Sequence, residues 1–190
     1  MDFSILFMGP VGAGKTEAIR SLSDIEVVDT DLRPTDGTAL LKATTTVSMD
    51  VGVLDLGDGY KLRMYGAPGQ DRFDFMWEIL LDQAKGIVIL LNHAAADPIA
   101  DFDHYVARIH AALGGRKLPT AIGITHIDDD AATAIDIYQA HLRRVTIPFA
   151  ACMPAILQMD ARSRHDVRAM VMALGGMLEM QHRFAPRTRA

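Results

Sequence analysis

A glycine-rich segment near the start of the chain limits the folds open to this sequence more than any other feature. Residues 9–16 read GPVGAGKT, directly after the apolar run Phe3–Met8 and at the start of a helical pattern over 15–22. The spacing GxxxxGK[ST] between a strand and a helix is typical of a phosphate-binding loop, in which glycines let successive backbone N–H groups point at phosphate oxygens. The segment therefore predicts binding of a nucleoside triphosphate.

This loop is expected to make most of the contacts with the nucleotide. Lys15 would reach the β- and γ-phosphates and take part in catalysis, and the Thr16 hydroxyl would bind Mg²⁺. The loop residues predicted to bind nucleotide are Gly9, Val11, Gly12, Ala13, Gly14, Lys15, Thr16 and Glu17. The loop alone defines neither the base nor whether a second substrate accepts the phosphate.

Short apolar runs alternate with helical patterns along the rest of the chain. The predicted strands are Phe3–Met8, Val47–Leu54, Lys61–Tyr65, Ile87–Asn92, Thr120–Thr125 and Ala155–Met159. The predicted helices cover 15–22, 71–85, 98–113, 131–143 and 164–182. Only Gly57-Asp58-Gly59 and its flanks separate the second and third runs, which predicts an antiparallel hairpin. The alternation predicts an α/β sheet with helices on both faces and ligands beyond the carboxyl ends of the strands.

Composition narrows the class of protein further. The 190 residues suit one domain, which we expect over 1–182, with a flexible basic tail over 183–190. A net charge of −5 gives no reason to expect a nucleic-acid partner. The single cysteine, Cys152, fits a reducing compartment. No signal peptide, membrane span or lipidation motif is recognised, so a cytoplasmic protein without a stable membrane anchor is expected.

Two segments after later strands are candidates for the base site. Thr125, His126 and Asp128 follow the fifth strand, and Ala161 and Arg162 follow the sixth. A carboxylate at Asp128 can accept hydrogen bonds from guanine N1–H and the N2 amine, a donor pair that adenine lacks. Two charge-assisted bonds of about 1.5–3 kcal/mol each would favour GTP over ATP by roughly 10²–10⁴-fold. Capping of the following helix is the alternative role for Asp128, and its position after the fifth strand favours the base.

With these residues the chain resembles small GTPases of the Ras superfamily, in particular the bacterial MglA-like branch and its Arf and signal-recognition-particle-receptor β-subunit kin. The resemblance runs from about residue 3 to about residue 180. The switch I threonine matches Thr46, with Thr44 and Thr45 as alternatives in register, and implies a second Mg²⁺ ligand. The switch II motif reads Gly66 to Gln70, with Gly69 near the phosphate.

The resemblance implies a single P-loop G domain. Its sheet would be mixed and six-stranded, with one antiparallel hairpin strand and about five helices. It also implies a cycle of GTP binding and hydrolysis that depends on Mg²⁺, and partner proteins that bind the switches. For the MglA-like branch the implied partner class is a Roadblock/LC7-fold dimer.

Three positions depart from the motifs of the family. Gly66 stands where an aspartate normally helps to hold the Mg²⁺ shell, so we expect nucleotide binding to depend less on Mg²⁺ than in relatives that have the aspartate. MglA-like sequences share this departure. Thr125 replaces the usual asparagine, and His126 replaces the lysine that runs under the base. Discrimination of guanine is then left to Asp128.

For hydrolysis, Gln70 is the residue expected to orient the attacking water. Without an arginine near the γ-phosphate, such a site turns over on the order of 10⁻⁴ times per second. Arg33 and Arg72 are candidate arginines in cis, and a solvated surface position is the alternative for each. Val11 would crowd an arginine that arrives from a partner, so stimulation by reshaping of the switches is expected.

Other functions remain open at this stage. One alternative is a nucleotide-locked scaffold with negligible turnover, which Gly66 and Val11 favour. Another is a P-loop kinase, with Arg162, Arg164 and Arg168 in a lid, although Gln70 and Asp128 would then have no role. In the predicted switch II helix, Phe73, Met76, Trp77 and Leu80 share an apolar face that is expected to be core, while Phe75 is a candidate partner surface.

Overall fold

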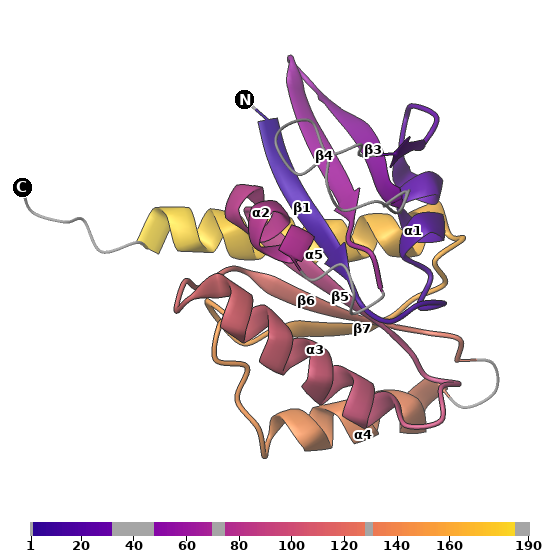
Figure 1. Ribbon diagram of the computed structural model, residues 1–190, viewed down its shortest axis with the longest axis vertical. Helices are drawn as coiled ribbons and strands as arrows, with labels where there is room; N and C mark the ends of the chain where they lie inside the picture. Colours follow the sequence, from indigo (N-terminus) through magenta and orange to yellow (C-terminus); the bar gives the residue numbers. More distant parts are fainter. Residues whose placement is uncertain (1, 32–47, 70–74, 128–130, 185–190) are drawn as a thin grey trace, which may run out of the picture.

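The computed structural model describes residues 2–31, 48–69, 75–127 and 131–184. Within these residues seven strands form one sheet in the order β2-β3-β4-β1-β5-β6-β7 (Figure 1). The strands are β1 Asp2–Met8, β2 Val28–Asp31, β3 Ser48–Gly57, β4 Tyr60–Gly66, β5 Gly86–Asn92, β6 Thr120–Thr125 and β7 Ala155–Gln158. The helices are α1 Lys15–Leu22, α2 Phe75–Gln83, α3 Pro98–Leu113, α4 Ala131–Leu142 and α5 Arg164–Phe184.

The sheet is mixed, as predicted. Strand β3 pairs in antiparallel fashion with β2 and with β4, and every other pair is parallel. The hairpin between β3 and β4 turns at Asp58, whose φ of 52° lies in the left-handed region, between two glycines with positive φ. The predicted α/β class, the antiparallel hairpin, the six predicted strands and the five helices are all confirmed.

A seventh strand, β2, was not predicted from the sequence. It pairs with the outer side of β3, from Val28 against Val51 to Asp31 against Ser48. Its sequence, VDTD, has one apolar residue in four, so it shows neither the alternation nor the apolar run that indicates a strand. Pairing with a longer strand stabilises it instead. The first residues of the predicted switch I loop therefore belong to the edge of the sheet.

Helices cover both faces of the sheet and make two hydrophobic clusters. On one face α1 and α5 pack against β1, β5 and β6 through residues such as Ile19, Leu22 and Leu174, all buried. On the other face α2, α3 and α4 supply large buried rings, among them Trp77, Phe102 and Tyr138. Figure 1 shows the sheet between these two groups of helices. The central strands β5 and β6 are buried throughout, apart from one end of β5, which is typical of a parallel sheet covered on both sides.

Local sequence signals define the ends of α3 and the core face of α2. Asp97 caps α3 by accepting a hydrogen bond from the Ala100 amide at 2.9 Å, ahead of Pro98 in the first turn. Gly114 ends this helix with a φ of 57°. In α2, Met76, Trp77 and Leu80 are buried, which confirms the predicted core face for the described residues. The described helices include no segment long and apolar enough to cross a membrane.

Candidate functional site

The loop after β1 curves around the ammonium group of Lys15. Its Nζ donates hydrogen bonds to the carbonyl oxygens of Gly9 at 2.7 Å and Pro10 at 2.8 Å. Burial lowers the pKa of Lys15 to about 8, and the negative charge of Asp50 acts in the opposite direction. The loop thus holds a buried cation at the start of α1, where the helix dipole also favours an anion. Such an arrangement suits phosphate.

Gly14, the residue before α1, brings this loop against the segment after β7. Its φ is 90°, and a Cβ placed on it would lie 2.9 Å from the Cβ of Ala161. Both the backbone conformation and the contact exclude a larger residue at this position. The P-loop and Ala161, two elements that the sequence assigned to phosphate and base, are therefore neighbours.

Thr125 ties the segment after β6 to the same loop. Its Oγ1 is 3.1 Å from the carbonyl oxygen of Ala13 and 3.1 Å from that of Leu91, so its one proton has two acceptors. The Nδ1 of His126 lies 2.9 Å from the same Oγ1. Thr125 is 2% exposed, so this hydroxyl is paired within the protein and not with water. A threonine thus links the predicted base segment to the P-loop at the position where the family has asparagine.

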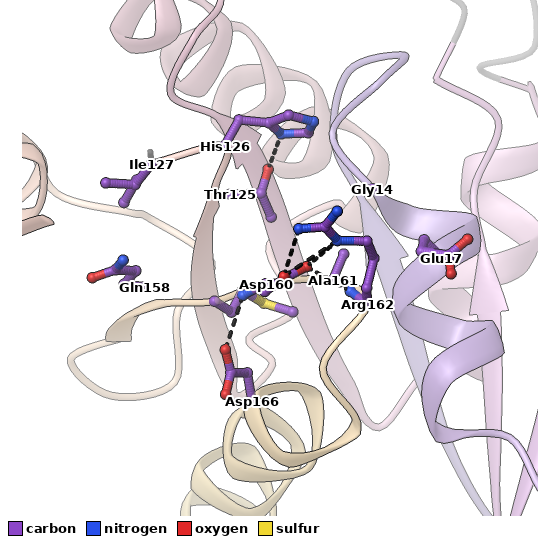
Figure 2. A pocket seen from close by; sticks show the side chains of 11 residues that line it. Gly14, Glu17, Thr125, His126, Ile127, Gln158, Asp160, Ala161, Arg162 and Asp166 are labelled. Carbon is purple, nitrogen blue, oxygen red and sulfur yellow. Dashed lines mark hydrogen bonds and ion pairs between the residues drawn. The ribbon is translucent and has the colours of Figure 1, made fainter. Parts of the chain in front are cut away.

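A pocket of about 610 Å³ opens between these segments (Figure 2). That volume lies within the roughly 300–1,000 Å³ of small-molecule sites. Its walls come from the P-loop side and from the segments after β6 and β7. The pocket is lined by Gly14, Glu17, Thr125, His126, Ile127, Gln158, Met159, Asp160, Ala161, Arg162 and Asp166. Sequence reasoning named six of these residues as nucleotide contacts, and the structure brings all six together.

Arg162 lies in the pocket wall with its guanidinium turned back on Asp160, as Figure 2 shows. Its Nε donates to Asp160 Oδ1 at 2.9 Å, and its Nη2 donates to Oδ2 at 2.8 Å. These hydrogen bonds lower the pKa of Asp160 to about 2. The backbone amide of Asp160 in turn donates to Asp166 at 3.0 Å. The loop after β7 is thus stabilised by the ion pair between Arg162 and Asp160 and by the hydrogen bond from the Asp160 amide to Asp166.

Two further residues of the pocket wall, His126 and Glu17, were predicted to contact the nucleotide. His126 is exposed and has a φ of 57°, so the chain turns sharply between Thr125 and Ile127. Glu17 lines the pocket from α1, and its carboxylate accepts a hydrogen bond from Arg20 at 2.7 Å. This exposed ion pair on one helix contributes about 0.3–0.5 kcal/mol to stability.

The segment after β4 packs directly on the P-loop. A Cβ placed on Gly69 would lie 2.8 Å from the Val11 amide nitrogen and 2.9 Å from Lys15 Nζ, so no side chain fits there. The Tyr105 hydroxyl donates to the Gly69 carbonyl at 3.1 Å, and Trp77 Nε1 donates to the carbonyl of the preceding residue at 3.3 Å. The two rings stack with centroids 5.4 Å apart. Hydrogen bonds from α2 and α3 therefore hold this segment near Lys15.

Sequence reasoning missed one residue near the predicted metal ligand. The Thr16 hydroxyl donates to Oδ2 of Asp50, on β3, at 2.6 Å. The only signal in the sequence is a carboxylate between Met49 and Val51, within a strand that also contains Ser48 and Asp55. Hydroxyl and carboxylate oxygens are ligands that Mg²⁺ prefers. Among the described residues no three His, Cys, Asp or Glu side chains gather to hold a metal, so a Mg²⁺ site here would also need phosphate and water oxygens.

Several predicted residues lie outside the described part of the chain. These are Thr46 with its alternatives Thr44 and Thr45, Gln70, Asp128, Arg33, Arg72 and Phe73. The side chain of Phe75 also lies outside it. Their predicted roles are untested by the geometry.

Comparison with known proteins gives distant similarities, and no family model matches. The chain is 30% identical to the intraflagellar transport protein 22 homologues of rat and human over 88 residues, which is 46% of this chain and 45% of each relative. It thus spans about half the length of those relatives. An uncharacterised protein of Methanocaldococcus jannaschii is 26% identical over 137 residues, 72% of this chain and 78% of that protein. This distant similarity supports a relationship to small GTPases over about half of the chain.

The tie made by Thr125 can be tested with the isosteric Thr125→Val variant. Loss of the hydroxyl leaves two buried carbonyl oxygens without this donor, which should lower the free energy of unfolding by about 1–3 kcal/mol. It should also loosen the P-loop and speed the release of bound nucleotide. Urea unfolding and the dissociation of a fluorescent guanine nucleotide measure the two effects.

Thr120→Val is the matched control on the same strand. Thr120 is also fully buried, but its hydroxyl donates locally to the Leu118 carbonyl at 3.0 Å, at the opposite end of β6. It should lower stability without changing nucleotide release. Equal release rates in the two variants would contradict the role given to Thr125.

Proposed function

We propose that this protein is a guanine-nucleotide switch that binds GTP with Mg²⁺ and hydrolyses it slowly. One observation carries the proposal: the P-loop, through Gly14, meets the segment 125–127 and Ala161 around one pocket at the carboxyl ends of β1, β6 and β7. A triphosphate bound at Lys15 would place its base in that pocket. The supported relationship to small GTPases agrees with this assignment.

The preference for guanine rests on Asp128. The chain reaches this residue directly after Ile127, which lines the pocket. A carboxylate there would accept the N1–H and N2 amine of guanine, and the small Ala161 would let a backbone N–H approach the guanine oxygen. The aliphatic stem of Arg162, whose guanidinium is paired with Asp160, would lie against the base.

The catalytic part of the proposal involves few residues. Lys15 would bind the β- and γ-phosphates, Thr16 and Thr46 would hold Mg²⁺, and Gln70 would orient the attacking water. Bound Mg²⁺ supplies neutralisation of charge on the β- and γ-phosphates. Gly69 packs on Val11 and Lys15 and directly precedes Gln70 in the sequence, which supports this role for Gln70. The chemistry then depends mainly on positioning and on fixed charges.

The Val11 side chain supports the expectation of slow turnover. It is 67% exposed, so it would stand in the path of an arginine approaching from a partner. A partner would then stimulate hydrolysis by reshaping the switches, or an arginine in cis, Arg33 or Arg72, would act. The same feature favours a second candidate function, a nucleotide-locked scaffold with negligible turnover.

A P-loop kinase fits the described geometry less well. Of the arginines that such an enzyme would need in a lid, Arg162 is paired with Asp160. Arg164 donates to backbone carbonyls of α1 at 3.0 and 3.2 Å and to Asp24 at 2.8 Å. Both side chains brace the fold, which leaves them poorly placed to close over a transferred phosphate.

We also propose a branch of the small GTPases, domain bounds, a compartment and a class of partner for this chain. We place the chain in the MglA-like branch, as one G domain over 1–182 with a basic tail over 183–190, acting in the cytoplasm of a bacterium. Its switches would bind a regulatory protein, for which a Roadblock/LC7-fold dimer is the proposed class. The exposed Ile79 on α2, the helix that follows the switch II segment, offers an apolar contact there.

The nucleotide that co-purifies with the protein tests the proposal directly. We expect GDP in the purified protein, and slow release of phosphate from added GTP but not from added ATP. Retained GTP without phosphate release would support the scaffold. A preference for ATP would contradict the assignment of the base site.

Asp128→Asn should change the base that the protein binds. An amide at this position no longer accepts both guanine donors, so affinity for GDP should fall by about 10²-fold or more. The new N–H group matches the carbonyl oxygen that xanthine has in place of the guanine amine, so affinity for xanthosine diphosphate should rise. Competition against a fluorescent nucleotide measures both affinities.

An Asp160→Asn variant serves as the control, because this residue lines the same pocket without an assigned base contact. It should leave the ratio of guanosine to xanthosine diphosphate affinities nearly unchanged. If Asp128→Asn also leaves that ratio unchanged, Asp128 caps α4 and does not read the base.

A further inference from the structure

Asp50 lies where the missing switch II carboxylate would be. It is paired with Gly66 in the register between β3 and β4, and directly opposite residues of an antiparallel pair point to the same face. A Cβ placed on Gly66 would lie 3.0 Å from Oδ2 and 3.1 Å from Cβ of Asp50. The Asp50 side chain therefore occupies the space into which a side chain at position 66 would project.

The same carboxylate already contacts the predicted metal ligand. Asp50 Oδ2 is 2.6 Å from Thr16 Oγ1. In an octahedral Mg²⁺ shell with bonds of about 2.1 Å, neighbouring ligand oxygens are about 3 Å apart. The two oxygens thus need to separate by only a few tenths of an ångström to become neighbours in one shell.

We propose that Asp50 is the acidic group of the magnesium site, supplied by β3 in place of the aspartate that is missing at position 66. This inference rests on the proposed function, since it assumes a nucleotide with Mg²⁺ at Thr16. It replaces the expectation that the glycine weakens Mg²⁺ dependence. A metal responds to the position and charge of an oxygen ligand, and the strand that supplies it makes no difference.

Moving the carboxylate to β3 has a consequence for the switch. Thr46, the proposed switch I ligand, precedes Asp50 by four residues. Outside the P-loop, the proposed protein ligands of the metal would then be the Asp50 carboxylate on β3 and the Thr46 hydroxyl shortly before this strand in the sequence. The segment after β4 would be free of the metal and would report only the γ-phosphate, through Gly69.

The Asp50→Asn variant tests this assignment in the full-length protein. The amide retains the size and the acceptor for Thr16 but removes the charge. Loss of a supporting ligand typically lowers metal affinity about 10–100-fold. The Mg²⁺ concentration that gives half-maximal retention of fluorescent GDP should therefore rise by about 10–100-fold, measured by dissociation rates across a Mg²⁺ titration with a chelator.

Two further variants sharpen the result. Asp50→Ala combined with Gly66→Asp returns the carboxylate to β4 and removes the nearest contact, Oδ2 of Asp50, so that only small shifts of the residue-50 Cβ and of Ile19 Cδ1 are needed; it should recover most of the Mg²⁺ dependence. Asp58→Asn, in the turn of the same hairpin, is the control and should match the unmodified protein. Circular dichroism of each variant checks its folding.

The possible results distinguish a failure of the proposed function from a failure of the Asp50 assignment alone. An unmodified protein that binds no GDP at any Mg²⁺ concentration would overturn the proposed function, and this inference with it. GDP retention that is independent of Mg²⁺ in the unmodified protein would overturn the inference alone, without any variant. So would a Mg²⁺ requirement that Asp50→Asn does not change, since the contact with Thr16 would then be a structural hydrogen bond only.

Discussion

The rest of the site depends on the turn that the chain makes around the Lys15 ammonium group. The carbonyl oxygens of Gly9 and Pro10 accept hydrogen bonds from this group, and these bonds close the loop after β1. Neighbouring segments then pack on the closed loop at distances that exclude larger side chains, as Gly14 and Gly69 show. A buried cation with its partners on one side needs an anion on the other. The loop is therefore suited to an anion, which is the basis of the proposed nucleotide site.

Two departures from the usual motif have physical replacements nearby. Thr125 has a shorter side chain than asparagine, yet its hydroxyl reaches the Ala13 carbonyl and ties the base segment to the P-loop. Asp50 fills the space opposite Gly66. In both cases we propose that the needed atom is supplied at the same place, from another residue type or another strand. Motif matching alone would count both as defects.

Much of the fold was readable from the sequence because its signals are local. The P-loop context, the glycine-flanked turn at Asp58 and the cap at Asp97 each lie within a few residues, and the structure has all of them. Strand β2 was not readable, since its four residues are stabilised by pairing with β3 and not by their own pattern. The contact between Asp50 and Thr16 was not readable either, because it depends on how α1 packs on β3 and joins residues 34 positions apart. The roles of Gln70 and Asp128 remain predictions.

The central claim is that the pocket beside the P-loop selects guanine. Titration calorimetry of nucleotide-free protein with GDP and with ADP tests it most directly, since both ligands offer the same phosphates and ribose and differ only in the base. We expect GDP to bind roughly 10²–10⁴-fold more tightly than ADP. Equal affinities, or tighter binding of ADP, would contradict it.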